Sequence, residues 1–158
     1  MPLRSGLPAI TGTSPRVLIL GSFPSEKSLD TGEYYANVRN QFWRLLGSVV
    51  HFDPELPYNG RVAAVTAADV ALWDVVHSCR RAGSLDSKID RKTLLLNHFD
   101  VFLAEYPTVE RVYVNGLTAY ELFGRLDVDL PATRLPSSSG ALTMSFEEKL
   151  AAWQVVHP

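Results

Sequence analysis

The chain has little cysteine and no long apolar run, and each absence excludes a class of protein. Cys79 is the only cysteine among 158 residues. An intramolecular disulfide and a four-cysteine zinc or iron–sulfur site are therefore excluded. No apolar run reaches the length of a membrane span, and residues 1–15 lack the apolar segment of a signal peptide. We therefore expect a cytoplasmic protein that has no membrane partner.

The sequence also lacks an excess of either charge. Its formal net charge is −2 at pH 7, so binding of nucleic acid must use a local patch rather than a generally basic surface. Apolar residues make up 46% of the chain and the mean hydropathy is +0.02, values typical of a globular protein. The length predicts one domain over residues 1–158, in which residues 1–15 form an extended N-terminal lead-in.

Several sequence signatures of catalysis are absent as well. There is no GxSxG nucleophile elbow, and the segment after the first predicted strand lacks the glycines of a Walker or dinucleotide-binding loop. The histidines show no metal-ligand spacing; they are His51, His77, His98 and His157. These absences argue against a serine hydrolase and a nucleotide-phosphate site, and the sequence predicts neither a metal nor a cofactor.

Strand and helix patterns alternate along the rest of the chain. The expected strands are residues 16–20, 69–76, 111–115 and 133–135. The expected helices are residues 40–50, 93–105 and 117–126, with a last helix that begins after a capping box at Ser145, while residues 51–66 are expected to form a loop. This alternation favours a three-layer α/β/α sandwich around a four-stranded, mostly parallel sheet.

Polar or small residues follow each predicted strand. They are Gly21-Ser22, Asp74, Asn115-Gly116 and residues 136–140. The carboxyl ends of parallel strands meet at one edge of a sheet, so these residues would line one crevice. Turn formers are common at strand ends in any case, but the loop after residue 20 is too long and too aromatic for a simple connection. Aromatic rings, amides and one carboxylate are suited to hold a flipped-out nucleobase.

Four ordered blocks of sequence then carry a more specific resemblance. They read GSFPS…GEYYANVRNQFW, ALWDVVHSCRRAGSLDSKI, VYVNGLTAYELF and LPSSSGAL…SFEEKLAAW, from about Arg16 to Trp153. Together they resemble the uracil-DNA glycosylase superfamily, and within it the hypoxanthine-DNA (DNA-deoxyinosine) glycosylase branch. The resemblance implies the same three-layer α/β/α sandwich that the alternation of patterns predicts.

The resemblance implies two candidate catalytic residues. The first active-site motif has Ser22 and Phe23 where many relatives place a water-activating Asp or Asn. In the hypoxanthine branch, the resemblance implies that Asn40, in the RNQFW block, orients the water. Its alternative role is to cap the following helix. Asp74 stands where uracil-specific enzymes carry a base-reading Asn, and an ionised carboxylate suits the N1–H of a purine lactam. Asp74 is alternatively the general base for the water.

The remaining site residues also follow from the resemblance. Tyr35 is expected to stack on the base, with Tyr34 packed in the loop or facing solvent, and Asn115 to read the base edge or form a turn before Gly116. The expected base-binding set is Ser22, Phe23, Tyr35, Asp74 and Asn115. Leu142 is expected to wedge into the base stack or to pack on the final helix. The expected DNA-binding set is Ser25, Arg39, Pro136, Ser137, Ser138, Ser139 and Leu142.

These observations predict a monofunctional DNA glycosylase that acts in base excision repair. We expect it to act as a monomer on DNA with a damaged base and to release hypoxanthine from deoxyinosine. Two alternatives remain open: a glycosylase of the same fold that acts on uracil, xanthine or a mismatched pyrimidine, and a non-catalytic protein that binds damaged DNA or a nucleotide. Base specificity, strand preference and opposite-base preference do not follow from the sequence.

Overall fold

The computed structural model describes all residues, 1–158, and centres on a four-stranded parallel sheet in the order β3-β2-β6-β7. The strands are β2 (Val17–Gly21), β3 (Val70–Asp74), β6 (Arg111–Asn115) and β7 (Ala132–Leu135). All four begin within one residue of the predicted start, and β6 has the predicted bounds. The expected three-layer α/β/α sandwich is therefore confirmed.

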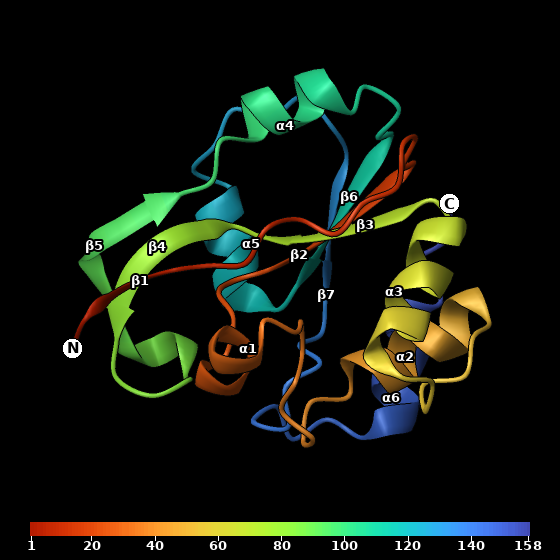
Figure 1. Cartoon of the computed structure of the whole chain (residues 1–158), viewed down its shortest axis with the longest axis horizontal. Coiled ribbons are helices and arrows are strands. Elements are labelled where there is room, and N and C mark those ends of the chain that lie inside the picture. Colours follow the sequence, from red (N-terminus) through yellow and green to blue (C-terminus); the bar gives the residue numbers. More distant parts are fainter.

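Strand β2 shows how one sheet serves two cores. Its side chains alternate: Leu18 and Leu20 join one buried cluster, whereas Val17 and Ile19 join the other. The first cluster lies under α4 (Phe99–Glu105) and α5 (Leu117–Phe123), and the second under α2 (Phe42–Val50), α3 (Tyr58–Ala67) and α6 (Phe146–Trp153). Figure 1 shows these two groups of helices on opposite sides of the sheet.

A second, antiparallel sheet of three strands was not expected. It has the order β1-β4-β5, with β1 (Leu3–Ser5), β4 (Val76–Arg81) and β5 (Ile89–Leu96), and the turn between β4 and β5 contains the short 3₁₀ helix η1 (Asp86–Lys88). The prediction of a helix over residues 93–105 was thus wrong for its first part, since the helix begins at Phe99. The predicted lead-in also contains a strand, because β1 pairs with β4.

Two helices were missed in segments that contain turn-forming residues. The predicted loop at residues 51–66 contains most of α3, which begins directly after Pro57, and proline is tolerated at the start of a helix. The polar segment after β2 contains α1 (Glu26–Thr31), which is capped by Ser25 and ends at Gly32 with φ 72°. None of the helices has the length and apolar character needed to cross a membrane.

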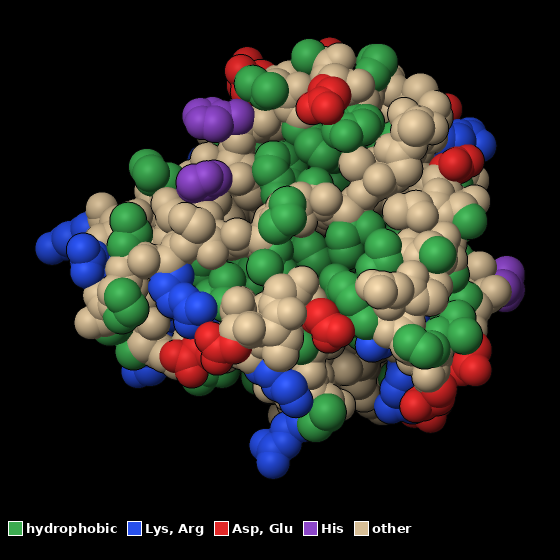
Figure 2. All heavy atoms as spheres, viewed as in Figure 1, with side chains coloured by type: hydrophobic (Ala, Val, Ile, Leu, Met, Phe, Trp, Pro, Cys, Tyr) green, Lys and Arg blue, Asp and Glu red, His purple; other side chains and the backbone are tan.

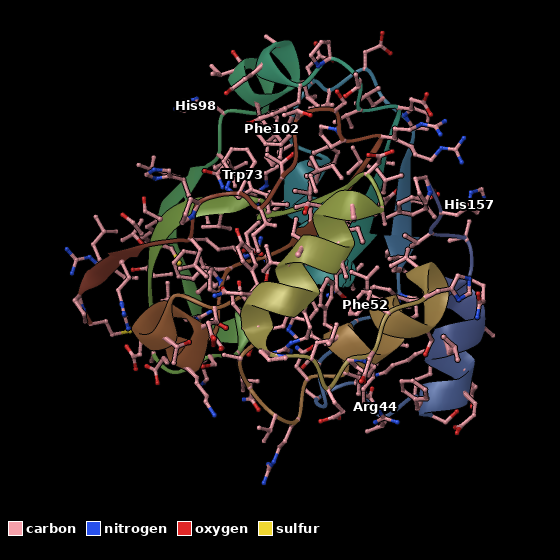
Figure 3. All side chains as sticks on the ribbon, turned by 45° about the vertical axis from the view of Figure 1, so that its right-hand side comes forward. Arg44, Phe52, Trp73, His98, Phe102 and His157 are labelled. Atoms are coloured by element: carbon pink, nitrogen blue, oxygen red, sulfur yellow. The ribbon has the colours of Figure 1, made fainter.

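The histidines and many of the charged side chains lie at the surface. On the face shown in Figure 2, Lys and Arg side chains lie mainly along the left and lower margins, with Asp and Glu among them. Figure 3 shows His98 and His157 on opposite sides of the molecule, whereas Trp73 of β3 and Phe102 of α4 lie together with ring centroids 4.9 Å apart. No group of three or more potential metal ligands occurs.

Candidate active site

The polar residues that follow the parallel strands meet in one crevice at the carboxyl edge of the sheet. Its volume is about 650 Å³. Segments from five parts of the chain line it: residues 21–25, 34–40, 84–87, 115–118 and 137–142, together with Asp74. The convergence of these distant segments confirms the geometric expectation drawn from the strand ends. The hairpin residues 84–87 are an addition that the sequence did not predict.

Gly21 allows two functional side chains to approach the backbone at the floor of the crevice. A Cβ atom at this position would lie 2.5 Å from Oδ1 of Asp74 and 2.8 Å from the hydroxyl oxygen of Tyr35. Any other residue would therefore displace both groups. The register of the sheet explains the first contact, because Gly21 of β2 pairs directly with Asp74 of β3.

Asp74 is a buried residue of the crevice lining, and its carboxyl group makes no hydrogen bond within the protein. The residue is 4% exposed, and its Oδ2 atom makes no hydrogen bond. Burial and, to a smaller extent, the negative charge of Asp86 raise the pKa of Asp74 to about 7, although the Arg81 guanidinium lowers it. Asp74 therefore changes charge near neutral pH and offers an unpaired atom to a ligand in the crevice.

Tyr35 is held in an uncommon backbone conformation beside Asp74. Its φ is 52°, a value in the left-handed region that aromatic residues seldom adopt. One face of its ring stacks on Phe42 at a centroid distance of 3.8 Å and an interplanar angle of 11°. Its hydroxyl accepts a hydrogen bond of 3.3 Å from Nδ2 of Asn115. The neighbouring Tyr34 is buried, as one of its two expected positions required.

Ser138 connects three of the segments that build the crevice. It has no exposed surface, its hydroxyl donates to Oδ1 of Asn40 at 2.7 Å, and it accepts from Nδ2 of Asn115 at 2.9 Å. Its backbone N–H donates to Oδ1 of Asn115, and its carbonyl accepts from the N–H of Gln41. The expected contact of the Ser138 side chain with phosphate therefore does not fit this structure, because the hydroxyl is buried among protein partners.

The same network decides what Asn40 and Asn115 can offer to a ligand. Oδ1 of Asn40 accepts from Ser138 and, at 3.0 Å, from the backbone N–H of Phe42, the first residue of α2, although the N-cap position itself is Gln41. Because both lone pairs of this oxygen are in use, the group that Asn40 offers is its Nδ2 donor. Asn115 uses both Nδ2 hydrogens on Tyr35 and Ser138. Its role as a base reader stays a prediction, and its contacts favour a positioning role.

A buried lysine supports this network from the side of α6. Lys149 is 1% exposed, and its ammonium group donates to Oε1 of Gln41 at 2.9 Å and to the carbonyl of Ser139 at 3.0 Å. Burial lowers the pKa of Lys149. The lysine thus joins the loop after β7 to the residue that precedes α2, behind the wall of the crevice.

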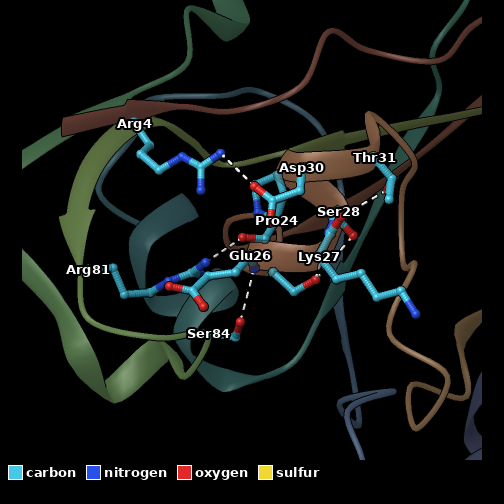
Figure 4. A network of polar contacts seen from close by, with 10 residues as sticks. Arg4, Pro24, Glu26, Lys27, Ser28, Asp30, Thr31, Arg81 and Ser84 are labelled. Carbon is cyan, nitrogen blue, oxygen red and sulfur yellow. Dashed lines mark hydrogen bonds and ion pairs between the residues drawn. The ribbon is translucent and has the colours of Figure 1, made fainter. Parts of the chain in front are cut away.

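The β4–β5 hairpin closes the crevice on the side of the first motif. Ser22 donates its hydroxyl to Oδ1 of Asp86 at 2.6 Å. Figure 4 shows two further contacts, from the backbone N–H of Glu26 to Ser84 and from Arg81 to the carbonyl of Pro24. Arg81 also lies over the ring of Phe23, which is buried. Arg81 is therefore bound within the protein.

The other residues expected to bind DNA lie at different depths. Ser25, Arg39, Ser137, Ser139 and Leu142 all line the crevice, and Arg39 and Leu142 are exposed. Pro136 does not line it; its carbonyl accepts a hydrogen bond from the indole of Trp153. His77 is exposed and lies outside the lining of the crevice.

Sequence reasoning missed two charged groups and two apolar ones. Asp86 and Lys149 stand within the quoted motif blocks, yet only the hairpin and the packing of α6 show their contacts. Leu85 and Leu117 line the crevice while more than half exposed, so with Leu142 they give its rim three apolar side chains. The pairing of β4 with β5, a long-range contact, is what brings Leu85 and Asp86 to the site.

Comparisons with known proteins identify the same family and the same fold as the sequence resemblance. Residues 8–158 match the uracil DNA glycosylase superfamily. A protein of Methanosarcina barkeri named hypoxanthine DNA glycosylase is 33% identical over 95% of both chains, and one of the same name from Methanosarcina acetivorans is 31% identical over 98% of both. A solution NMR structure from Methanosarcina acetivorans, described as a candidate uracil DNA glycosylase, superposes with a TM-score of 0.83 at 31% identity over 98% of this chain and 96% of that one.

Proposed function

The chain belongs to the uracil DNA glycosylase superfamily and is a DNA N-glycosylase, and from this premise we propose that it hydrolytically releases hypoxanthine from deoxyinosine. The observation that carries the proposal is the carboxyl group of Asp74, which lines the crevice and whose buried Oδ2 has no partner in the protein. An ionised carboxylate accepts hydrogen bonds and cannot donate them. Hypoxanthine presents an N1–H that would satisfy this carboxylate. The names of the two curated relatives support the same substrate.

Stacking gives the second contact of the proposed complex. One face of Tyr35 already lies on Phe42, and we propose that the opposite face takes the flipped base. The contacts that fix Tyr35 hold this ring in place before DNA binds, so little further ordering is required. Asn115 contributes by holding Tyr35 and Ser138 rather than by touching the base.

Asn40 positions the attacking water in this proposal. Its amide nitrogen donates to one lone pair of the water and leaves the other free to attack C1′ of the deoxyribose. The new bond joins the water oxygen to C1′, and the glycosidic bond from C1′ to N9 breaks with its electron pair leaving on the base. The water loses one proton, and the base takes one up from solvent. The sugar carries oxocarbenium character in the transition state, so a weakly activated water suffices.

The lining of the crevice favours hydrolysis over a covalent lyase step. It contains no lysine, and Lys149, which is near, is buried and donates to Gln41 and Ser139. A Schiff base would need a free amine in contact with C1′. We therefore propose a monofunctional enzyme, for which borohydride should trap no protein on DNA.

The direct test is base release from matched duplexes that carry deoxyinosine, deoxyuridine or deoxyxanthosine, each followed by alkali. The wild-type protein is compared with Asn40→Ala. We expect strong cleavage at deoxyinosine that is lost in the variant. Release of uracil or xanthine alone would leave the family assignment intact and overturn the proposal that hypoxanthine is the substrate. Uracil and xanthine also carry ring N–H donors that the carboxylate of Asp74 could accept.

A further inference from the structure

The hairpin between β4 and β5 brings a second carboxylate to the base pocket. Asp86 begins η1 and lines the crevice together with Leu85 and Ser87. The hydroxyl of Ser22, in the first motif, donates to Oδ1 of Asp86 at 2.6 Å, the short distance typical of a charge-assisted bond. Nothing in the mechanism above uses this contact.

The contact fixes the hydrogen-bonding character of this wall. A serine has one hydroxyl hydrogen, and that of Ser22 is committed to Asp86. What remains for a ligand is the lone pairs of Ser22 and the second carboxylate oxygen of Asp86, all of them acceptors. The hairpin is held in this position by Arg81 and by the contact between Ser84 and Glu26.

Asp74 adds a further hydrogen-bond acceptor at the floor of the pocket, because its Oδ2 atom is unpaired. This Oδ2 atom is buried and has no partner in the protein, and Asp74 lines the same crevice as Ser22 and Asp86. An unsatisfied buried acceptor indicates a ligand that donates a hydrogen bond. Three acceptors from three strand ends or hairpins thus surround the place where a base would enter.

We propose that Asp86 is a specificity-determining residue of the base pocket, which with Ser22 and the ionised form of Asp74 forms a surface that accepts hydrogen bonds and so selects bases with ring N–H donors. The inference rests on the proposed function for the identity of the base. Hypoxanthine can donate its N1–H to one of these acceptors. Adenine, the base from which hypoxanthine arises by deamination, carries a lone pair at N1 that two carboxylates repel, and only its 6-amino group can donate to them. The surface therefore disfavours the N1 position of the undamaged base.

Asp86 also acts on Asp74 through its charge. Burial is the largest cause of the raised pKa of Asp74; of the charged groups, Asp86 raises this pKa further and Arg81 lowers it. Burial, and to a smaller extent the charge of Asp74, raise the pKa of Tyr34 and Tyr35. Removal of the Asp86 charge should therefore move the ionisation of Asp74 to lower pH. A residue with a merely structural role would not produce this shift.

The test compares Asp86→Asn with the wild type under single-turnover conditions. Two duplexes are used, one with deoxyinosine and one with purine 2′-deoxyriboside, whose N1 is an acceptor. We expect Asp86→Asn to lower the ratio of hypoxanthine release to purine release by about tenfold, since the new amide can donate to N1. Asp129→Asn, an equal loss of charge at an exposed position outside the crevice, should leave the ratio unchanged. An unchanged ratio in Asp86→Asn overturns the proposal.

Two further measurements separate this proposal from the proposed substrate. Carboxyl ¹³C shifts of Asp74, followed against pH by NMR, should give a lower pKa in Asp86→Asn than in the wild type and no change in Asp129→Asn. If the wild type releases uracil instead of hypoxanthine, the proposed substrate is wrong. A fall in the uracil rate in Asp86→Asn then still supports Asp86, because uracil presents N3–H, and an unchanged rate overturns it. If Asp86→Asn fails to fold, Ser22→Ala removes the donor that holds Asp86 and is judged by the same ratio.

Discussion

The hydroxyl of Ser138 lies 2.7 Å from Oδ1 of Asn40, although 98 residues separate the two in sequence. This bond fixes the amide that we propose to hold the water, and it does so from the loop after β7. A proposed catalytic group and a loop expected to face DNA are therefore parts of one rigid unit. If the loop moved when DNA binds, the hydrogen bond from Ser138 would change the position of the Asn40 side chain.

Removal of the Ser138 hydroxyl should slow chemistry more than it weakens DNA binding. In Ser138→Ala, Asn40 keeps its bond to the N–H of Phe42 but loses the second donor that fixes its side chain. We expect kcat to fall about tenfold, equivalent to about 1.4 kcal/mol, with little change in KM. Steady-state cleavage of a deoxyinosine duplex measures both. Ser137→Ala is the matched control, and an equal loss there would contradict the role of Ser138.

Lys149→Met should destabilise the fold from a position that does not touch the substrate. Methionine has nearly the same length but leaves the side-chain oxygen of Gln41 and the carbonyl of Ser139 without their buried donor. We expect the free energy of unfolding to fall by about 1–3 kcal/mol. Urea denaturation at pH 7 checks this. Lys92→Met, at an exposed position of β5, should change stability by less than about 0.5 kcal/mol.

The Asp74→Asn variant should become more stable relative to the wild type as the pH rises, and it should lose activity. The folded-state pKa of Asp74, about 7, lies above the ordinary value of 3.8. Between these values the native state binds more protons than the unfolded state, so the wild type loses stability as the pH rises. The variant lacks this loss, and its stability relative to the wild type should increase by about 2 kcal/mol between pH 5 and pH 8.

Guanidinium unfolding of both proteins at the two pH values measures this difference. The release of hypoxanthine should fall at the same time, because the amide replaces the acceptor for N1–H. A stability difference that does not depend on pH would show that Asp74 titrates normally. The wild-type rate should also rise with pH through about 7, as Asp74 becomes the ionised acceptor.

Leu142→Ala should affect double-stranded substrates selectively. Leu142 is 37% exposed at the rim of the crevice, where we propose that it enters the base stack as the nucleotide flips. A single strand needs no such wedge. We expect about a tenfold loss on a deoxyinosine duplex and a smaller loss on the same single strand. Leu95→Ala, at an exposed leucine outside the crevice, should have no effect on either.

The central strands of the parallel sheet could be predicted from sequence because they are buried on both faces. Residues 17–20 and 112–114 are uninterrupted apolar runs, and such runs are typical of central parallel strands. The strand ends then placed Asp74 and Asn115 at one edge without any knowledge of side-chain contacts. The family resemblance supplied Asn40 and Tyr35, which no periodicity identifies.

The hairpin could not be predicted, because its strands depend on each other. Residues 93–96 carry apolar side chains that also suit a helix, and only the pairing with β4 makes them a strand. Because the hairpin was not predicted, Asp86 was not among the candidate site residues. The hydrogen bonds of Ser138 were inaccessible for the same reason, since a serine in a polar loop carries no signal of burial.

The single cysteine gives this enzyme a practical advantage for spectroscopy. Cys79 lies in β4 with no exposed surface, and burial raises the pKa of its thiol, so the folded protein presents no reactive thiolate to a labelling reagent. A cysteine introduced at the exposed Leu85 would therefore carry the only attached fluorophore, without prior removal of native thiols. Such a probe sits on the hairpin beside Asp86 and reports in real time when a base enters.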